Sequence, residues 1–117
     1  MDLYMCHWDE ERQQWGEPVN MGPEINTEGD EVYPRIVGDA LFFSSNGWEG
    51  FGGYDIYRVS FGHNIVMSGT LYHYPWPVNT VFNDFGMFFD GETGYFVSDR
   101  RGAAGKDDIY TFNAASN

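Results

Sequence analysis

The residues of this chain that could do chemistry recur at a fixed spacing. An aspartate followed by an aliphatic residue and a tyrosine stands at Asp2, Asp55 and Asp108, and each copy lies 53 residues from the next. A glycine-rich stretch precedes the second and third copies, with Gly52 in one and Gly105 in the other. Such a loop can hold a phosphate, or it can simply turn the chain.

Phosphate binding is the less favoured of these two roles. A phosphate-binding loop opens a helix, whose N-terminus completes the site. Here the residues after Gly53 have the composition of a strand, and no Lys-Ser or Lys-Thr pair follows. We therefore predict that the glycines permit a tight crossing between two strands and that the aspartate accepts N–H bonds from the loop. The pairs Asp55-Tyr57 and Asp108-Tyr110 are interpreted as structural motifs.

The sequence shows no complete set of the residues that a hydrolase needs. Ser44, Ser45 and Ser98 lack the Gly-x-Ser-x-Gly frame of a hydrolase nucleophile. The three histidines lack metalloprotease spacing. The single cysteine, Cys6, excludes an internal disulfide and a multi-cysteine zinc site. We expect no enzyme activity and no catalytic residues.

Calcium is the one ion that the acidic residues suggest. Carboxylate loops can supply its six to eight oxygen ligands, and acidic pairs or clusters occur at Asp30-Glu31, Asn83-Asp84, Asp107-Asp108 and residues 90–94. None fits the twelve-residue helix-loop-helix calcium pattern. We expect these residues to form a solvated acidic surface, with no bound cofactor or metal.

The 53-residue offset extends well beyond the Asp-aliphatic-Tyr signature. It relates, without a gap, Asn26-Thr27 to Asn79-Thr80, Gly38 to Gly91, Phe43 to Phe96 and Ser45 to Ser98. A period near 50 residues indicates an array of supersecondary units that bury their faces on one another. The chain is therefore predicted to be a repeat protein.

Four antiparallel strands are predicted in one period, at residues 31–37, 40–45, 54–61 and about 65–73. Fifteen glycines argue against helices. The sequence thus predicts an all-β protein made of four-stranded β-propeller blades, in an incomplete ring of about two blades. The strand at 31–37 is expected to be innermost.

The single region 1–117 divides into three parts under this interpretation. Residues 1–20 are the end of a preceding blade, 31–73 a complete blade, and 84–113 a further blade that lacks its last strand. Because a chain of two blades would leave sheet faces and edges open, which soluble proteins avoid, we expect it to be a piece of a larger propeller or to assemble with copies of itself.

Alternation along the third strand predicts which residues are buried. Tyr57, Val59 and Phe61 fall on one face. The repeat puts Tyr4, Cys6 and Trp8 in the same positions. Cys6 is therefore expected to be a buried apolar filler.

Charge narrows the choice of partner. Eighteen acidic and six basic residues give a net charge of −12. Nucleic acid and anionic membranes favour basic surfaces, so neither is an expected partner. No apolar run approaches the roughly 18 residues of a membrane-spanning helix. A protein partner is expected to present a basic or mixed face.

Two segments resemble a known repeat. These are WGEPVNMGPEINTEGDEVYP at 15–34 and LFFSSNGWEGFGGYDIY at 41–57. They resemble the WD-forty-like β-propeller repeat of bacterial cell-envelope proteins, which is related to the TolB propeller. The second copy, GYFVSDRRGAAGKDDIY, is looser. The resemblance implies a propeller scaffold in periplasmic or outer-membrane-associated proteins, often beside an OmpA-type peptidoglycan-binding domain.

Loop residues supply the candidates for binding. Trp48 and Trp76 could anchor a protein or stack on a sugar, and Arg100 and Arg101 lie in a variable loop. We expect Trp48 to be exposed, and Trp15 and Trp76 to pack between blades. The function predicted is a non-catalytic scaffold that binds a protein or envelope component. The alternative is a carbohydrate-binding module that uses the loop aromatics.

Overall fold

The structure is a computed structural model that describes residues 1–62, 65–90, 92–100 and 107–113. Within them it is all-β, as predicted: every regular element is a strand, and every paired strand is antiparallel. No helix in these ranges could cross a membrane. The strands are β1 (Tyr4–Met5), β2 (Trp8–Asp9), β3 (Gln14–Trp15), β4 (Val19–Asn20), β5 (Glu31–Val37), β6 (Ala40–Ser45), β7 (Asp55–Gly62), β8 (Ile65–Val66), β9 (Tyr72–His73), β10 (Asp84–Phe89), β11 (Thr93–Ser98) and β12 (Asp108–Asn113).

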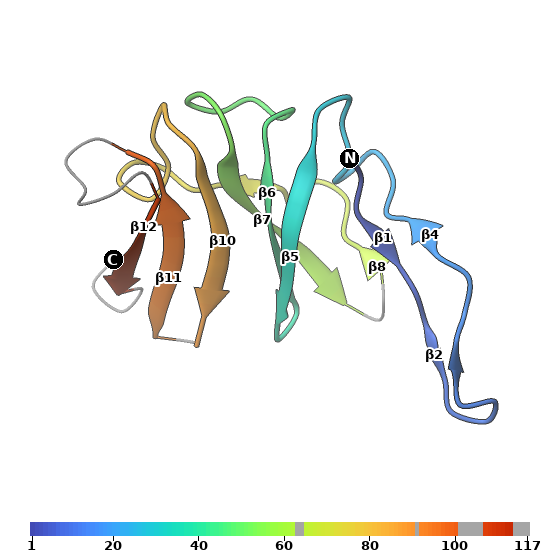
Figure 1. The fold of residues 1–117 in the computed structure, drawn as a ribbon. Coiled ribbons are helices and arrows are strands. Elements are labelled where there is room, and N and C mark those ends of the chain that lie inside the picture. The colour runs from blue at the N-terminus through green and yellow to red at the C-terminus, as the bar shows by residue number, and fades with distance from the viewer. Residues whose placement is uncertain (63–64, 91, 101–106, 114–117) are drawn as a thin grey trace.

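The strands form three groups that lie side by side in chain order (Figure 1). The first holds two small sheets, β1-β4 and β2-β3. The second has the order β5-β6-β7-β8, with β9 also paired to β7, and the third has the order β10-β11-β12. We call these groups units 1, 2 and 3. Each of the sheets formed by the described residues is open.

Unit 2 confirms the predicted antiparallel hairpins. β5 and β6 have the predicted bounds, and β7 is displaced by one residue. The prediction of one continuous fourth strand at 65–73 is wrong, because the chain turns at Ser68-Gly69, where Gly69 has a φ of 76°. The two short strands β8 and β9 take its place. The Ser60 N–H of β7 donates to Thr70 Oγ1, a side-chain atom, at 3.0 Å between them.

The first strands of units 2 and 3, β5 and β10, carry the same irregularity. The register of β5 against β6 shifts between Val32 and Arg35, and that of β10 against β11 shifts between Phe85 and Phe88. A residue with positive φ lies in each bulge: Tyr33 at 55° and Gly86 at 69°. These two positions are 53 residues apart, so the repeat extends to backbone conformation.

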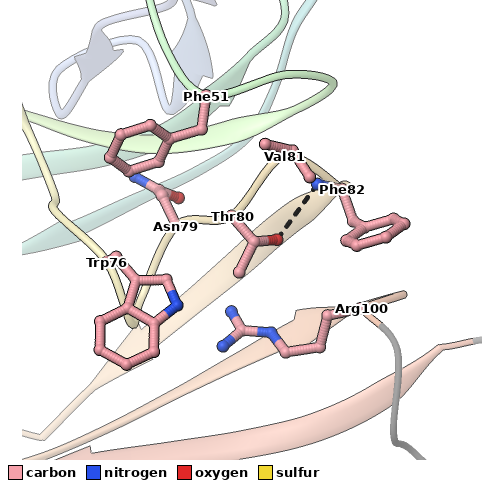
Figure 2. A pocket seen from close by; sticks show the side chains of 7 residues that line it. All are labelled: Phe51, Trp76, Asn79, Thr80, Val81, Phe82 and Arg100. Carbon is pink, nitrogen blue, oxygen red and sulfur yellow. Dashed lines mark hydrogen bonds between the residues drawn. The ribbon is translucent and has the colours of Figure 1, made fainter.

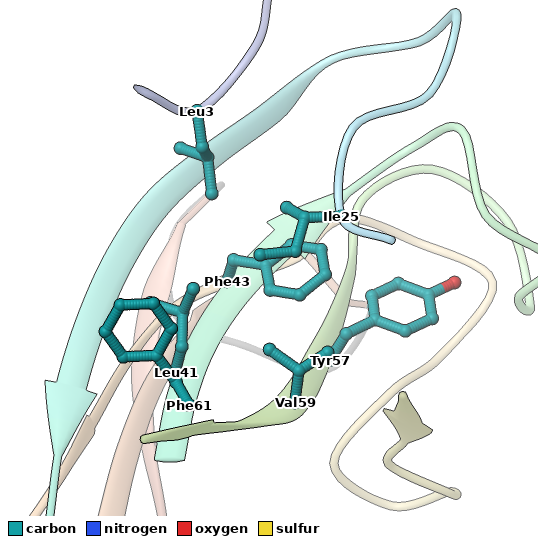
Figure 3. Close-up of a cluster of buried hydrophobic side chains, with 7 residues drawn as sticks. All are labelled: Leu3, Ile25, Leu41, Phe43, Tyr57, Val59 and Phe61. Atoms are coloured by element: carbon teal, nitrogen blue, oxygen red, sulfur yellow. The ribbon is translucent and has the colours of Figure 1, made fainter. Parts of the chain in front are cut away.

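Two apolar clusters hold the units together, because successive residues of a strand face opposite sides of its sheet. Phe43 of β6 packs toward unit 1, whereas its neighbour Phe42 packs toward unit 3. The cluster between units 1 and 2 is shown in Figure 3 and consists of Leu3, Ile25, Leu41, Phe43, Tyr57, Val59 and Phe61. The cluster between units 2 and 3 consists of Phe42, Ile56, Val78, Met87 and Phe96.

The alternation predicted for the third strand holds in unit 2 and fails in unit 1. Tyr57, Val59 and Phe61 are buried. The corresponding Tyr4, Cys6 and Trp8 are exposed, so Cys6 is not a buried filler. The side chains on this face of β7 pack against residues of unit 1. Among the described residues no further unit covers that face of β1.

Candidate binding site where the loops of the units meet

Asp55 begins β7 and holds the glycine-rich loop in place. Its Oδ2 accepts the Phe51 N–H at 2.7 Å, so the expected bond from the loop is present. His73 Nε2 of β9 lies 2.8 Å from the same oxygen. Burial raises the pKa of the Asp55 carboxyl, against the bonds from Phe51 and His73, which lower it. The Tyr57 hydroxyl donates to Glu49 O at 2.6 Å, and burial also raises the pKa of this phenol.

Unit 1 contains the equivalent of this arrangement. Asn20 Nδ2 donates to Asp2 Oδ2 at 2.9 Å, at the position where unit 2 has His73 and Asp55. In unit 3 the Tyr110 ring stacks on Phe96 at 5.8 Å between centroids, the same separation as between Tyr57 and Phe43. The structure therefore gives the Asp-aliphatic-Tyr signature a role inside the fold.

An asparagine clamps each junction between units. Asn79 accepts the Ile56 N–H at 2.7 Å and donates to Ile56 O at 2.9 Å and to Tyr74 O at 2.7 Å. Asn26 makes the equivalent pair of bonds to the main chain of Leu3, at 2.8 and 3.0 Å. Asn26 lies just before β5, the first strand of unit 2, and Asn79 lies just before β10, the first strand of unit 3.

Glu31 and Asp84, from two of the acidic pairs named above, are buried in polar networks, which corrects the prediction of a solvated acidic surface at these positions. Glu31 accepts bonds from Thr27 and from Ser45 Oγ, the latter at 2.6 Å. Asp84 makes the same bonds with Thr80 and Ser98. Strands β5 and β10 begin at these two carboxylates. The hydroxyls of Ser45 and Ser98 are therefore hydrogen-bond donors within the fold. Among the described residues no group of three or more His, Cys, Asp or Glu side chains could hold a metal ion.

The glycine-rich loop lies against the start of unit 3. A Cβ on Gly52 would lie 2.1 Å from the Val81 carbonyl oxygen, and one on Gly53 would lie 2.0 Å from Asn83 Oδ1. The Tyr54 N–H donates to the same Asn83 Oδ1 at 2.9 Å. The glycines thus let the loop of one unit approach the backbone of the next. Gly105, the corresponding residue of the second copy, lies outside the described residues, as does Arg101.

Trp48 and Arg100 serve the scaffold in equivalent places. Trp48 is half-buried, and its Nε1 donates to Ile25 O at 2.7 Å, so the prediction of an exposed Trp48 is wrong. Arg100 Nη2 donates to Val78 O, the corresponding carbonyl, at 2.6 Å and to Asp84 Oδ1 at 3.0 Å. The guanidinium also lies over the Phe96 ring, 5.2 Å from its centroid.

Trp76 has the exposure that was expected of Trp48. Its side chain is 72% exposed, and that of Trp15 is 64% exposed. The prediction that these two tryptophans pack between units is therefore wrong. Trp76 has Pro75 and Pro77 as neighbours in a connecting segment, outside any strand. The alternation of strands therefore gives no guide to its burial.

Trp76 borders a pocket of about 540 Å³. Figure 2 shows Phe51, Phe82 and Arg100 around the same space, with the segment 79–81 behind it. Arg100 is held by the Pro77 and Val78 carbonyls and by Asp84, and the Asn79 amide is fully engaged in its clamp. The surface left for a ligand is therefore mainly aromatic and aliphatic.

Trp76 and Arg100 were predicted from the sequence as binding residues, whereas Phe51, Val81 and Phe82 were not. Their signal was present, because Phe51 interrupts a run of glycines and Val81-Phe82 follows the repeated Asn79-Thr80 pair. The contact between the two segments depends on Gly52 lying against Val81. Comparisons of this chain with protein-family models, with curated protein sequences and with solved structures found no match.

Proposed function

We propose that this chain is part of a non-catalytic β-propeller scaffold of the bacterial cell envelope, which binds a protein partner where the loops meet. In this proposal unit 2 is a complete blade, unit 3 a further blade and unit 1 the end of a preceding blade, so the chain contributes about two blades. The envelope location, periplasmic or outer-membrane-associated, rests on the resemblance of residues 15–34 and 41–57 to the WD-forty-like repeat.

The proposal rests on one observation: where the loops of the units meet, the polar side chains are used within the fold and an aromatic side chain is left exposed. The polar groups that could do chemistry, such as Asp55, Asn79 and Asp84, are buried and bonded to the scaffold. The exposed Trp76 beside the apolar pocket is left for a ligand. Aromatic residues at the rim of a preformed apolar pocket are frequent anchors of protein interfaces.

The test is capture of a partner from a cell-envelope extract by the purified chain and by Trp76→Ala. We expect the wild type to retain a partner that Trp76→Ala loses, at an unchanged melting temperature. Trp15→Ala is the matched control, since Trp15 is a second exposed tryptophan that packs on Trp8 far from the pocket residues in sequence. Equal loss from both variants would contradict the proposal.

Carbohydrate binding is the alternative that the exposure of Trp76 also favours, because an exposed indole can stack on a sugar ring. Tryptophan fluorescence during a titration with soluble glycans distinguishes the two. A saturable change that is absent in Trp76→Ala and present in Trp15→Ala would support the carbohydrate-binding module. Turnover in a hydrolase screen that disappears on changing one polar residue would overturn both.

A further inference from the structure

A second pocket, of about 300 Å³, lies beside the first across the segment 82–83. Its walls are aromatic: the Tyr33 ring of β5 stacks on the Phe85 ring of β10 at 5.3 Å between centroids, with 22° between their planes. Tyr54, Asp99 and Asp107 also line it, together with Val32 and Asn83. Aromatic faces and carboxylates therefore meet in one cavity.

The carboxylate of Asp99 lines this cavity, and the partners that the described residues offer it are uncharged. It accepts the Asn83 N–H at 2.7 Å and the Asn83 Nδ2 at 2.9 Å, and both donors are neutral amides. Among the described residues it makes no salt bridge, unlike Asp84, which pairs with Arg100. A net charge of −12 over the chain adds to the negative potential.

Tyr33 occupies a backbone position that glycine fills in the next unit. Its φ of 55° corresponds to 69° at Gly86, and a β-bulge surrounds both residues. A residue with a Cβ is disfavoured in this region. The Tyr33 side chain is nevertheless 56% exposed, with its ring against Phe85. The fold therefore accommodates a ring here without burying it in the core.

We propose that this second pocket binds the cationic side chain of a lysine on a protein partner. The electron-rich faces of aromatic rings attract an ammonium group. The Asp99 carboxylate supplies the opposite charge, and the methylene stem of a lysine packs on the same rings. The basic side chain lies along the stacked Tyr33-Phe85 pair, with its ammonium group beside the Asp99 carboxylate.

This proposal names a chemical group that the partner in the proposed function would present. It rests on that function, because it assumes that a protein binds where the loops of the units meet. It concerns a separate set of residues, Tyr33, Phe85 and Asp99, whereas the pocket beside Trp76 is apolar. The two can therefore fail independently. A partner could bind at Trp76 and make no use of the second pocket.

The experiment uses Nα-acetyl-lysine amide as the probe and its uncharged analogue, Nα-acetyl-norleucine amide, as the ligand control. Binding is followed by the amide chemical shifts of ¹⁵N-labelled protein. We expect the lysine probe to shift the resonances of Tyr54, Phe85 and Asp99, with an effect that weakens as salt is added. The norleucine analogue should leave these resonances in place.

Three variants locate the site. Tyr33→Gly should weaken probe binding at least tenfold without lowering the melting temperature, since Gly86 occupies the equivalent position. Asp99→Asn should weaken it severalfold, and Glu17→Gln, at an exposed carboxylate outside the pocket, should leave it unchanged. Tyr33→Phe, which keeps the ring, should bind as the wild type does.

Several outcomes would overturn the inference. Equal shifts from the lysine and norleucine probes would mean that charge is not recognised. Unchanged affinity in Tyr33→Gly would remove the aromatic wall from the site. Binding that appears only after Arg101→Ala and Lys106→Ala would mean that a cation of the chain itself fills the pocket. If the wild-type chain does not bind the lysine probe but still captures a partner through Trp76, this inference is wrong and the proposed function stands.

Discussion

Asn79 and Asn26 illustrate how a single residue type secures each junction between units. Each amide bonds both main-chain groups of the aliphatic residue in an Asp-aliphatic-Tyr signature, Ile56 in one case and Leu3 in the other. Each also makes a third bond, Asn79 to Tyr74 O and Asn26 to Asn20 Oδ1, but Asn79 is fully buried whereas Asn26 is half-buried. The two clamps therefore differ in how much they lose when the side chain is removed.

Asn79→Ala should lower the free energy of unfolding by about 2–4 kcal/mol, because it removes the bond to the buried Ile56 N–H and one bond each to the Ile56 and Tyr74 carbonyls. Asn26→Ala should cost less, because water can reach the groups that it exposes. Urea unfolding of the two variants and the wild type measures the difference. Equal losses of unfolding free energy in Asn79→Ala and Asn26→Ala would contradict the expectation that the buried bonds of Asn79 contribute more.

The raised pKa of Asp55 predicts a pH dependence with a definite sign. Burial is the main cause of the shift above the ordinary value of 3.8. The folded chain then holds this proton more tightly than the unfolded chain, so the contribution of Asp55 to the free energy of unfolding falls as the pH rises through the window just above that value. Below it, the contribution is constant.

Asp55→Asn should therefore gain stability relative to the wild type as the pH rises above 3.8, the ordinary value of the aspartate pKa. The measurement is urea unfolding of both proteins at a series of pH values. If the wild type gains relative to Asp55→Asn as the pH rises, the bonds from Phe51 and His73 outweigh burial and the predicted sign is wrong.

The glycine-rich loop shows at the scale of an element why the repeat needs small residues. Gly52 and Gly53 face the backbone carbonyl of Val81 and the side chain of Asn83, at distances that no Cβ can occupy. By contrast, a Cβ on Gly62, at the end of β7, would meet nothing within 4 Å. The loop is therefore a contact between units.

Gly52→Ala should destabilise the chain by about 1–3 kcal/mol, the usual range for overpacking, because the Val81 backbone cannot move aside as a flexible side chain can. Gly62→Ala should be nearly neutral. Thermal unfolding compares the two substitutions directly. A melting temperature for Gly52→Ala equal to that of Gly62→Ala would show that the loop and unit 3 are not in close contact.

The strands could be predicted from the sequence where alternation and turn chemistry agree, as for β5, β6 and the positive φ of Gly38. The prediction failed where a side chain replaced a main-chain partner, as Thr70 does beside β7. It also failed for Trp48, whose indole satisfies the Ile25 carbonyl. That contact joins residues far apart in the sequence, and no local pattern reports it.

Glu31 and Asp84 are a further case, because an acidic residue beside glycine and asparagine has the local pattern of an exposed turn. Their burial depends on Ser45 and Ser98 at the end of the neighbouring strand. The signal was the 53-residue offset, which relates the threonine, the acid and the serine of unit 2 to those of unit 3. Interpreted as a set, these three residues would have predicted the network.

The molecule as a whole is a row of units with apolar clusters between them and apolar residues on its outer faces. Ile109 of β12 corresponds to Ile56, which is fully buried under unit 3, yet Ile109 is 73% exposed. Tyr95 corresponds to Phe42 and is also exposed. These residues are in the positions that the next unit covers elsewhere in the chain.

We therefore expect the face of unit 3 to be covered by a further unit, from the same polypeptide or from a second copy. Sedimentation of the isolated chain should show association that grows with concentration. Ile109→Lys should weaken this association while changing monomer stability by no more than about 0.5 kcal/mol, as is usual for exposed sites. A chain that stays monomeric at every concentration would contradict this expectation.

The most direct test of the central claim, that the loops of the units bind a partner while the repeated polar residues hold the scaffold, is to map the captured partner onto the chain by amide chemical shifts. We expect perturbed resonances at Phe51, Trp76, Val81 and Arg100, with those of the Gly38-Asp39 turn at the opposite end of β5 and β6 unchanged. Perturbations gathered at Gly38-Asp39 and absent around Trp76 would contradict it.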